Sequence, residues 1–193
     1  LFDPGPIDTP DIPIHLAAVN SYMCEVAGEV SEGLRPHPVC TAEYIKNIMW
    51  PGVRRGAAKS SRSIKDFSMS IKPLIATAPD EESLQGKIRD IRARVAFYAS
   101  TPAYRAAFEA HGLESLADEL KLLSRAQRWE EMPSRISDDV LNQYACVGTY
   151  DNIVAILKDR YADIVTNVEF SIPVNTPEDG DILRGMISEL RST

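Results

Sequence analysis

The sequence predicts an α/β fold built on parallel strands. Short apolar runs, typical of buried strands, alternate with stretches in which apolar residues recur at helical spacing. Over residues 14–77 the order is strand, helix, strand, helix, strand, which is typical of βαβ units with parallel strands. We expect one domain over residues 1–193, with about four parallel strands and a helical insertion between the third and the fourth.

The first three strands are predicted from the first 77 residues. Residues 1–13 hold four prolines among acidic residues, so we expect an extended lead-in. The apolar run Ile14–Val19 predicts the first strand, and Asn20 can cap the helix that follows it. Leu34–Val39 predicts the second strand and Phe67–Thr77 the third, each reached through a helix.

The second part of the chain is predicted to be mainly helical. Residues 80–145 carry apolar residues at helical spacing and form the expected insertion. Gly148 and Thr149 are predicted to open a further helix. Ile164–Ile172 predicts the fourth strand, and Ile182–Leu190 a closing helix.

Composition excludes several classes of protein. The chain has 21 Lys and Arg against 28 Asp and Glu, a net charge of -7, which argues against binding to nucleic acid. No apolar stretch approaches the length of a membrane span, and the acidic, proline-rich start is unlike a signal peptide. Three scattered cysteines, Cys24, Cys40 and Cys146, favour reduced thiols and a cytoplasmic location.

One strand-to-helix turn is a candidate phosphate site. Val19, Asn20 and Ser21 join the first strand to the first helix, at the carboxyl end of the predicted sheet. A helix N-terminus offers unpaired backbone N–H groups and partial positive charge, which suit a phosphate. The alternative is an ordinary helix cap beside solvent.

His37 is the candidate for a polar contact in the site. It lies near the carboxyl end of the second strand, and Arg35 points to the same side. The alternative is a histidine held at the rim by its neighbours. Cys40 lies close to His37, but the remaining histidines and cysteines show no ligand spacing, so we predict no metal site and no cysteine nucleophile. The basic residues between 54 and 65 are interpreted as a solvated helix and loop.

A series of motifs adds a resemblance to this interpretation. They are Pro13–Met23, Glu25–Val30 with Glu32-Gly33, Leu34–Pro38, Gly56–Ala58, Phe97–Tyr104 and Val147–Thr149. In order and spacing they resemble the luciferase-like monooxygenase superfamily, and the later ones its coenzyme F420-dependent branch. The resemblance extends from Pro13 to about Phe170. Asn20-Ser21 stands where the family has Gly-Pro, and Ser31-Glu32-Gly33 where it has Ala-Asp-Gly.

The resemblance implies the second half of a (β/α)8 TIM barrel that binds a reduced flavin, coenzyme F420 or FMN, at its carboxyl face. The matching positions imply phosphate contacts at Ala18, Val19, Asn20 and Ser21, with Glu32 and Gly33 beside the flavin. The implied function is an oxidoreductase that performs hydride transfer or flavin–oxygen chemistry on a small organic substrate. The alternative is a non-catalytic flavin-binding or subunit-interaction domain.

Half a barrel would leave its sheet open. We expect unpaired edges at Ile14–Val19 and Ile164–Ile172, with apolar residues facing the side that a full barrel encloses. Such a face would be covered by a missing N-terminal half, by a second copy in a homo-oligomer, or by the insertion. We favour the missing half, because the chain begins at Leu1 and not at a methionine.

Overall fold

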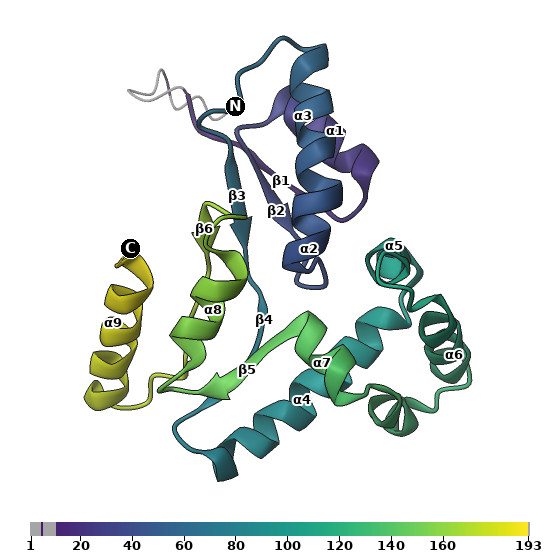
Figure 1. Ribbon diagram of the computed structural model, residues 1–193, viewed down its shortest axis with the longest axis vertical. Helices are drawn as coiled ribbons and strands as arrows, with labels where there is room; N and C mark the ends of the chain where they lie inside the picture. The colour runs from purple at the N-terminus through teal and green to yellow at the C-terminus, as the bar shows by residue number, and fades with distance from the viewer. Residues whose placement is uncertain (1–4, 6–10, 193) are drawn as a thin grey trace.

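The computed structural model describes residue 5 and residues 11–192, so most of the predicted lead-in lies outside the described residues. Strands β1 (His15–Ala18), β2 (Gly33–Pro36), β3 (Ser68–Ile71) and β6 (Asn167–Val168) form a parallel sheet in the order β1-β2-β3-β6 (Figure 1). This confirms four parallel strands, with β1 and β6 as the edges of the sheet.

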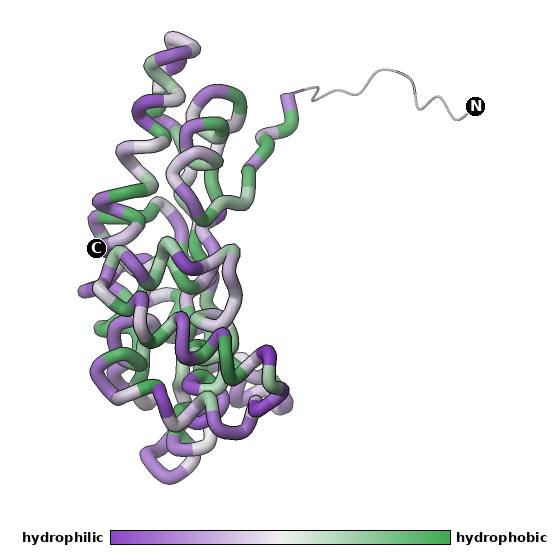
Figure 2. Tube along the Cα trace, turned by 90° about the vertical axis from the view of Figure 1, so that its right-hand side faces the viewer, coloured by the Kyte–Doolittle hydropathy of each residue, from purple (hydrophilic) through white to green (hydrophobic). Residues whose placement is uncertain are grey.

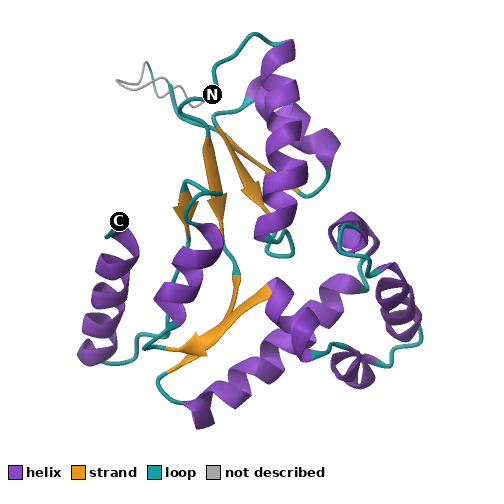
Figure 3. Cartoon of the chain, viewed as in Figure 1, coloured by secondary structure: helices purple, strands orange, loops and turns teal. Residues whose placement is uncertain are grey.

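The predicted third strand divides into two. It ends as β3 at Ile71 and resumes as β4 (Leu74–Ala78), which pairs with a strand that the sequence analysis missed, β5 (Ala145–Thr149). Pro73 lies at the division and has no N–H to donate to a ladder. The helix expected to open at Gly148 begins instead at Ile153, and the fourth strand shrinks to the two residues of β6 (Figure 3).

The helices form groups on the strands, as Figure 1 shows. The first group holds α1 (Ser21–Val30), α2 (Ala42–Tyr44), the π-helical turn η1 (Ile45–Met49) and α3 (Trp50–Lys59). The insertion holds α4 (Glu81–Ala99), η2 (Pro102–Tyr104), α5 (Arg105–Glu109), α6 (Glu114–Arg125), η3 (Trp129–Arg135) and α7 (Asp138–Tyr144). The chain continues with α8 (Ile153–Tyr161) and α9 (Pro177–Arg191). The insertion is therefore helical, as predicted, up to the start of β5.

Helices α1 and α3 cross in close contact because glycines lie at the crossing. A Cβ atom on Gly56 would come within 1.8 Å of the backbone oxygen of Glu25. A Cβ atom on Gly28 would lie 2.1 Å from the backbone oxygen of Val53. Any side chain at either position would push the two helices apart. The crossing therefore holds α3 close to α1 from Ser21, beside Gly52, to Gly28.

The two faces of the four-stranded sheet differ in character. Pairing in register places Leu34 beside Met69 on one face, and both are fully buried. The other face carries small, polar and charged side chains: His15, Ala17, Gly33, Arg35, Ser68, Ser70 and Asn167. The expectation that apolar strand residues face the open side is wrong, because alternation turns them toward the core. Helix α4 packs on β4 and β5, so the insertion extends the core there.

The distribution of hydrophobic and hydrophilic residues along the chain agrees with this arrangement. Hydrophobic and hydrophilic residues alternate along much of the tube in Figure 2, as expected for helices with one buried face. The three cysteines are free thiols, and all of them are buried. Among the described residues no helix is long and apolar enough to cross a membrane.

Candidate functional site

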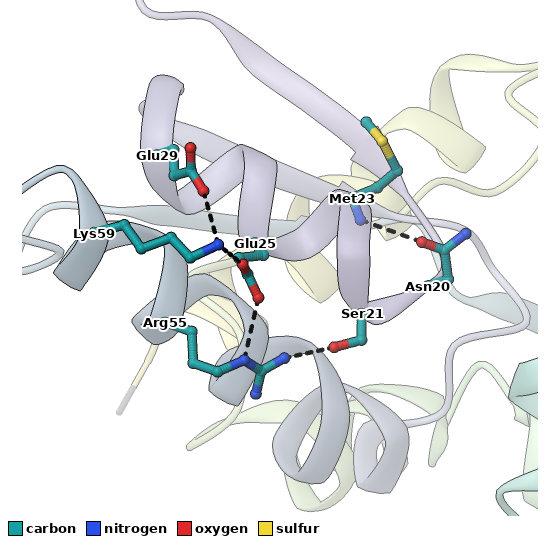
Figure 4. Close-up of polar contacts among 7 residues, drawn as sticks. All are labelled: Asn20, Ser21, Met23, Glu25, Glu29, Arg55 and Lys59. Carbon is teal, nitrogen blue, oxygen red and sulfur yellow. Dashed lines mark hydrogen bonds and ion pairs between the residues drawn. The ribbon is translucent and has the colours of Figure 1, made fainter.

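The turn between β1 and α1 has the geometry of a capped helix N-terminus. Asn20 is extended, with φ -92 and ψ 161, and its side-chain oxygen accepts the backbone N–H of Met23 at 3.2 Å (Figure 4). Its backbone oxygen accepts the N–H of Cys24, also at 3.2 Å. An extended residue with a short polar side chain is what starts a helix here, as the sequence predicted.

The same turn leaves two backbone donors open. The N–H groups of Ser21 and Tyr22 precede the first possible intrahelical acceptor and have no partner within the described part of the chain. Asn20 is exposed, 74% of Tyr22 is exposed and Ser21 is half-buried, so the turn lies at the surface. The helix dipole adds partial positive charge at this point. Two free donors in a positive field favour an anion.

Arg55 adds a cation to the turn that the sequence analysis missed. It was interpreted as part of a solvated basic stretch, but its Nη2 donates to Ser21 Oγ at 2.6 Å and its Nε to Glu25 Oε2 at 3.2 Å (Figure 4). Lys59 donates to the same Glu25 carboxylate. The hydrogen bond from Lys59 and, as the smaller effect, the one from Arg55 lower the pKa of Glu25. The carboxylate therefore stays charged and holds Arg55 in place.

The glycine crossing is the signal that could have found Arg55. Gly52 and Gly56 are four residues apart in α3, a spacing that permits close helix contact. Close contact brings Arg55, which lies between the two glycines in the sequence, to the first turn of α1. Without the partner helix identified, however, the sequence does not say which surface Arg55 meets.

The structure brings only part of the predicted site together. Ala18 is buried and Val19 half-buried, directly before the exposed Asn20. Gly33 instead pairs with His15, where β1 and β2 begin. The preceding Glu32 accepts hydrogen bonds from the Ile14 backbone at 2.9 Å and from Arg62 at 2.8 Å. Glu32 and Gly33 therefore lie at the opposite end of β1 from the turn.

His37 lies next to the turn but is held by aromatic rings. Its backbone N–H donates to the oxygen of Ala18 at 3.3 Å, which joins it to the end of β1. Its ring stacks on Tyr104 with centroids 4.1 Å apart and meets the ring of Tyr98 edge-on at 4.8 Å. Its Nδ1 accepts the N–H of Val39 at 3.4 Å. Burial lowers the pKa of His37, so the ring is neutral near pH 7.

Two other features lie apart from this chemistry. Cys40 is fully buried, and burial raises the pKa of its thiol to about 12, which suits neither a nucleophile nor a metal ligand. A groove of about 780 Å³ runs between α8, α9 and β6, and no residue of the turn lines it.

Known proteins resemble this chain over most of its length. The family model for luciferase-like monooxygenases matches residues 2–167. An uncharacterized protein of Mycobacterium tuberculosis is 33% identical over 99% of this chain and 55% of its own length. The F420-dependent glucose-6-phosphate dehydrogenase of Mycobacterium avium is 29% identical over 63% of this chain and 36% of its own length. The chain thus spans about half the length of the curated relatives it matches.

Solved structures share the fold. A coenzyme F420-dependent tetrahydromethanopterin reductase from Methanopyrus kandleri superposes with a TM-score of 0.70 and 18% identity, over 91% of this chain and 49% of its own. An F420-dependent secondary alcohol dehydrogenase gives a TM-score of 0.61 and 13% identity, over 94% and 50%. The parallel sheet corresponds to about half of a TIM-barrel-like fold. With the family model matched over most of its residues, the chain belongs to the luciferase-like monooxygenase family, a family of oxidoreductases.

Proposed function

We propose that this chain forms part of an F420-dependent oxidoreductase that transfers hydride to or from a small organic substrate. The turn at Asn20 and Ser21 would hold the phosphate of the cofactor. The observation that carries the proposal is the pair of open N–H groups at Ser21 and Tyr22, with the Arg55 guanidinium beside them. The named relatives that use F420 are dehydrogenases and a reductase, which favours hydride transfer over oxygen chemistry and F420 over FMN.

The residues of the turn fit a phosphate. Its oxygens would accept from the backbone N–H groups of Ser21 and Tyr22, as anions do at helix N-termini. Arg55 already donates to Ser21 Oγ, so its guanidinium lies within reach of an oxygen bound at the same amides. Asn20 uses its side-chain oxygen for the cap and keeps its amide N–H groups for the ligand. Asn20 takes this place in the turn without backbone strain, because its φ of -92 is ordinary for a residue with a Cβ atom.

The cofactor supplies the hydride chemistry when it is bound. The chain supplies a fixed anion site at the carboxyl end of β1, where ligands of parallel α/β folds bind. His37 presents a neutral ring at the neighbouring strand end, where it would make a polar contact with the flavin or the substrate. Its aromatic neighbours Tyr98 and Tyr104 come from the insertion, so the insertion would close one side of the site.

Charge reversal at the cap tests the proposal. Asn20→Asp keeps the cap, since Asp accepts the Met23 N–H as well as Asn does, but places a carboxylate against the phosphate. Coulomb repulsion at a partly desolvated site costs on the order of 1–4 kcal/mol, so F420 affinity should fall at least fivefold. F420 fluorescence titration measures this, and Asn20→Ser is the uncharged control that keeps the cap.

The outcomes separate three cases. A much larger loss of affinity in Asn20→Asp than in Asn20→Ser, which loses only the amide N–H contacts, supports the phosphate site. Unchanged affinity in Asn20→Asp with an intact fold removes it. Binding with no hydride transfer to or from any tested substrate would favour the alternative, a non-catalytic cofactor-binding domain. FMN binding in preference to F420 would correct the cofactor.

A further inference from the structure

Three charged side chains from three strands meet on the open face of the sheet. Arg35 lies in β2, Lys72 directly follows β3, and Glu169 directly follows β6. The Glu169 carboxylate accepts from Lys72 Nζ at 3.0 Å and, through its other oxygen, from Arg35 Nη2. The side chains of Arg35, Lys72 and Glu169 are 48%, 59% and 42% exposed, so all three are open to solutes.

The charges of this trio do not balance. Two cations share one carboxylate, and each oxygen of Glu169 is taken by one of them. Arg carries five N–H donors and Lys three, so most of the donors of Arg35 and Lys72 have no partner among the residues that the structure describes. The strand residues that register places on the same face contribute no second acid: His15, Ala17, Gly33, Ser68, Ser70 and Asn167. The described strand positions of this face, together with Lys72 and Glu169, therefore have a net positive charge.

Most side chains beside these three charged residues on the open face are small. Inward positions of barrel strands are usually filled by bulky branched residues. Here four of the seven described strand positions on this face are small: Ala17, Gly33, Ser68 and Ser70. A Cβ atom at Gly33 would lie 2.7 Å from the His15 ring, so this ring lies directly over the glycine. Apart from Gly33, which His15 covers, the small side chains next to the exposed cations fill little of the space above the sheet.

We propose that Arg35 and Lys72 bind the carboxylate or phosphate group of a small-molecule substrate. Glu169 holds the two cations in position while no ligand is bound. This deepens the proposed function, on which it rests, by naming an anionic substrate class. The Arg35 guanidinium matches an oxyanion with two parallel donors, and Lys72 adds a point charge. Arg35 lies one position before the end of β2, so the substrate would bind at the same carboxyl edge of the sheet as the turn.

Anion titrations test the site directly. Inorganic phosphate and acetate are added in separate titrations at constant ionic strength, while NMR follows the Arg35 side-chain N–H and the Glu169 carboxyl carbon. We expect both signals to shift and to saturate together with at least one of the two anions. Arg35→Gln should weaken the affinity at least tenfold, and Lys72→Gln should weaken it too. Arg62→Gln is the matched control, because it breaks a separate ion pair with Glu32.

The outcomes decide between a substrate site, a cofactor site and no site. Shifts that never saturate, or that saturate equally in Arg35→Gln, overturn the proposal and leave ionic screening only. A second titration in the presence of F420 identifies the source of the anion. Unchanged phosphate or acetate affinity assigns the site to a substrate, whereas competition by F420 assigns it to the cofactor and overturns the substrate assignment. F420 binding is read separately at the Ser21 and Tyr22 amides, so failure of the proposed function is distinguished from failure at Arg35.

Discussion

Replacing Gly56 with alanine tests the close crossing of α1 and α3, on which the position of Arg55 depends. The added Cβ atom would lie 1.8 Å from the backbone oxygen of Glu25 and 3.0 Å from the backbone nitrogen of Glu29. Both neighbours are backbone atoms of a helix, so no side chain can rotate away. The helices must separate by roughly 1 Å or more to restore a normal contact, and in a close-packed interior such a shift opens gaps elsewhere.

We expect Gly56→Ala to lower the free energy of unfolding by about 1–3 kcal/mol, the usual cost of overpacking. The better helix propensity of alanine offsets only roughly 0.5–1 kcal/mol of this cost. The matched control is Gly86→Ala in α4, where the nearest atom to the new Cβ would be the far end of Arg89 at 3.8 Å. That variant should be stabilised by about 0.5–1 kcal/mol.

Urea unfolding followed by circular dichroism measures both variants against the unchanged chain. The m value should stay constant, so that a change in midpoint reports stability. Because the shift also moves Arg55 away from Ser21, F420 affinity should fall in Gly56→Ala and not in Gly86→Ala. Equal stabilisation of the two variants would refute the close crossing and the placement of Arg55 that follows from it.

Three further predictions concern buried groups. The His111 ring lies 2.9 Å from Thr41 Oγ1, and burial lowers its pKa against the opposing effect of Glu43, so the unfolded chain takes up the proton first. Stability should fall as pH drops below about 6.5, and pH-dependent unfolding should show a smaller fall in His111→Gln, the remainder coming from His37, whose pKa burial also lowers. Tyr144 donates to the backbone oxygen of Ala107 at 2.9 Å, so Tyr144→Phe should cost about 1–2 kcal/mol in thermal unfolding, and a neutral result would contradict this buried bond. The three cysteines are buried, so a thiol reagent should react with them at the rate of unfolding; fast reaction of the native chain would show that a thiol is accessible.

The turn was the part of the site that sequence could predict. An apolar strand followed at once by a capping residue is a local pattern, and Asn20 caps α1 as the pattern indicates. The helical insertion could also be predicted, because helical spacing of apolar residues is a local pattern. The parallel order followed from helices between strands, since a crossover connection forces neighbouring strands to run the same way.

The parts that sequence did not predict depend on distant partners. The pattern around Gly148 fits a helix start, and only pairing with β4 makes the segment a strand. Arg55 meets Ser21 across 34 residues, through a helix crossing that no local pattern reveals. The open face was mispredicted because apolar residues were assigned to it without following the alternation, which places Arg35 there and buries Leu34. Because that face is polar, it gives no ground for the expected association through an apolar surface. Strands β1 and β6 are still the edges of the sheet, so oligomerisation or a completing N-terminal half stays a prediction.

The proposed function requires the turn between β1 and α1 to hold the phosphate of F420. Backbone amide NMR of the 15N-labelled chain during an F420 titration tests it most directly, because each N–H reports on its own surroundings. We predict that the largest shifts fall on Ser21 and Tyr22, whose N–H groups are open, and that the Arg55 side chain shifts with them. Largest shifts in the groove between α8 and α9, with Ser21 and Tyr22 unchanged, would show that the turn does not bind the cofactor phosphate.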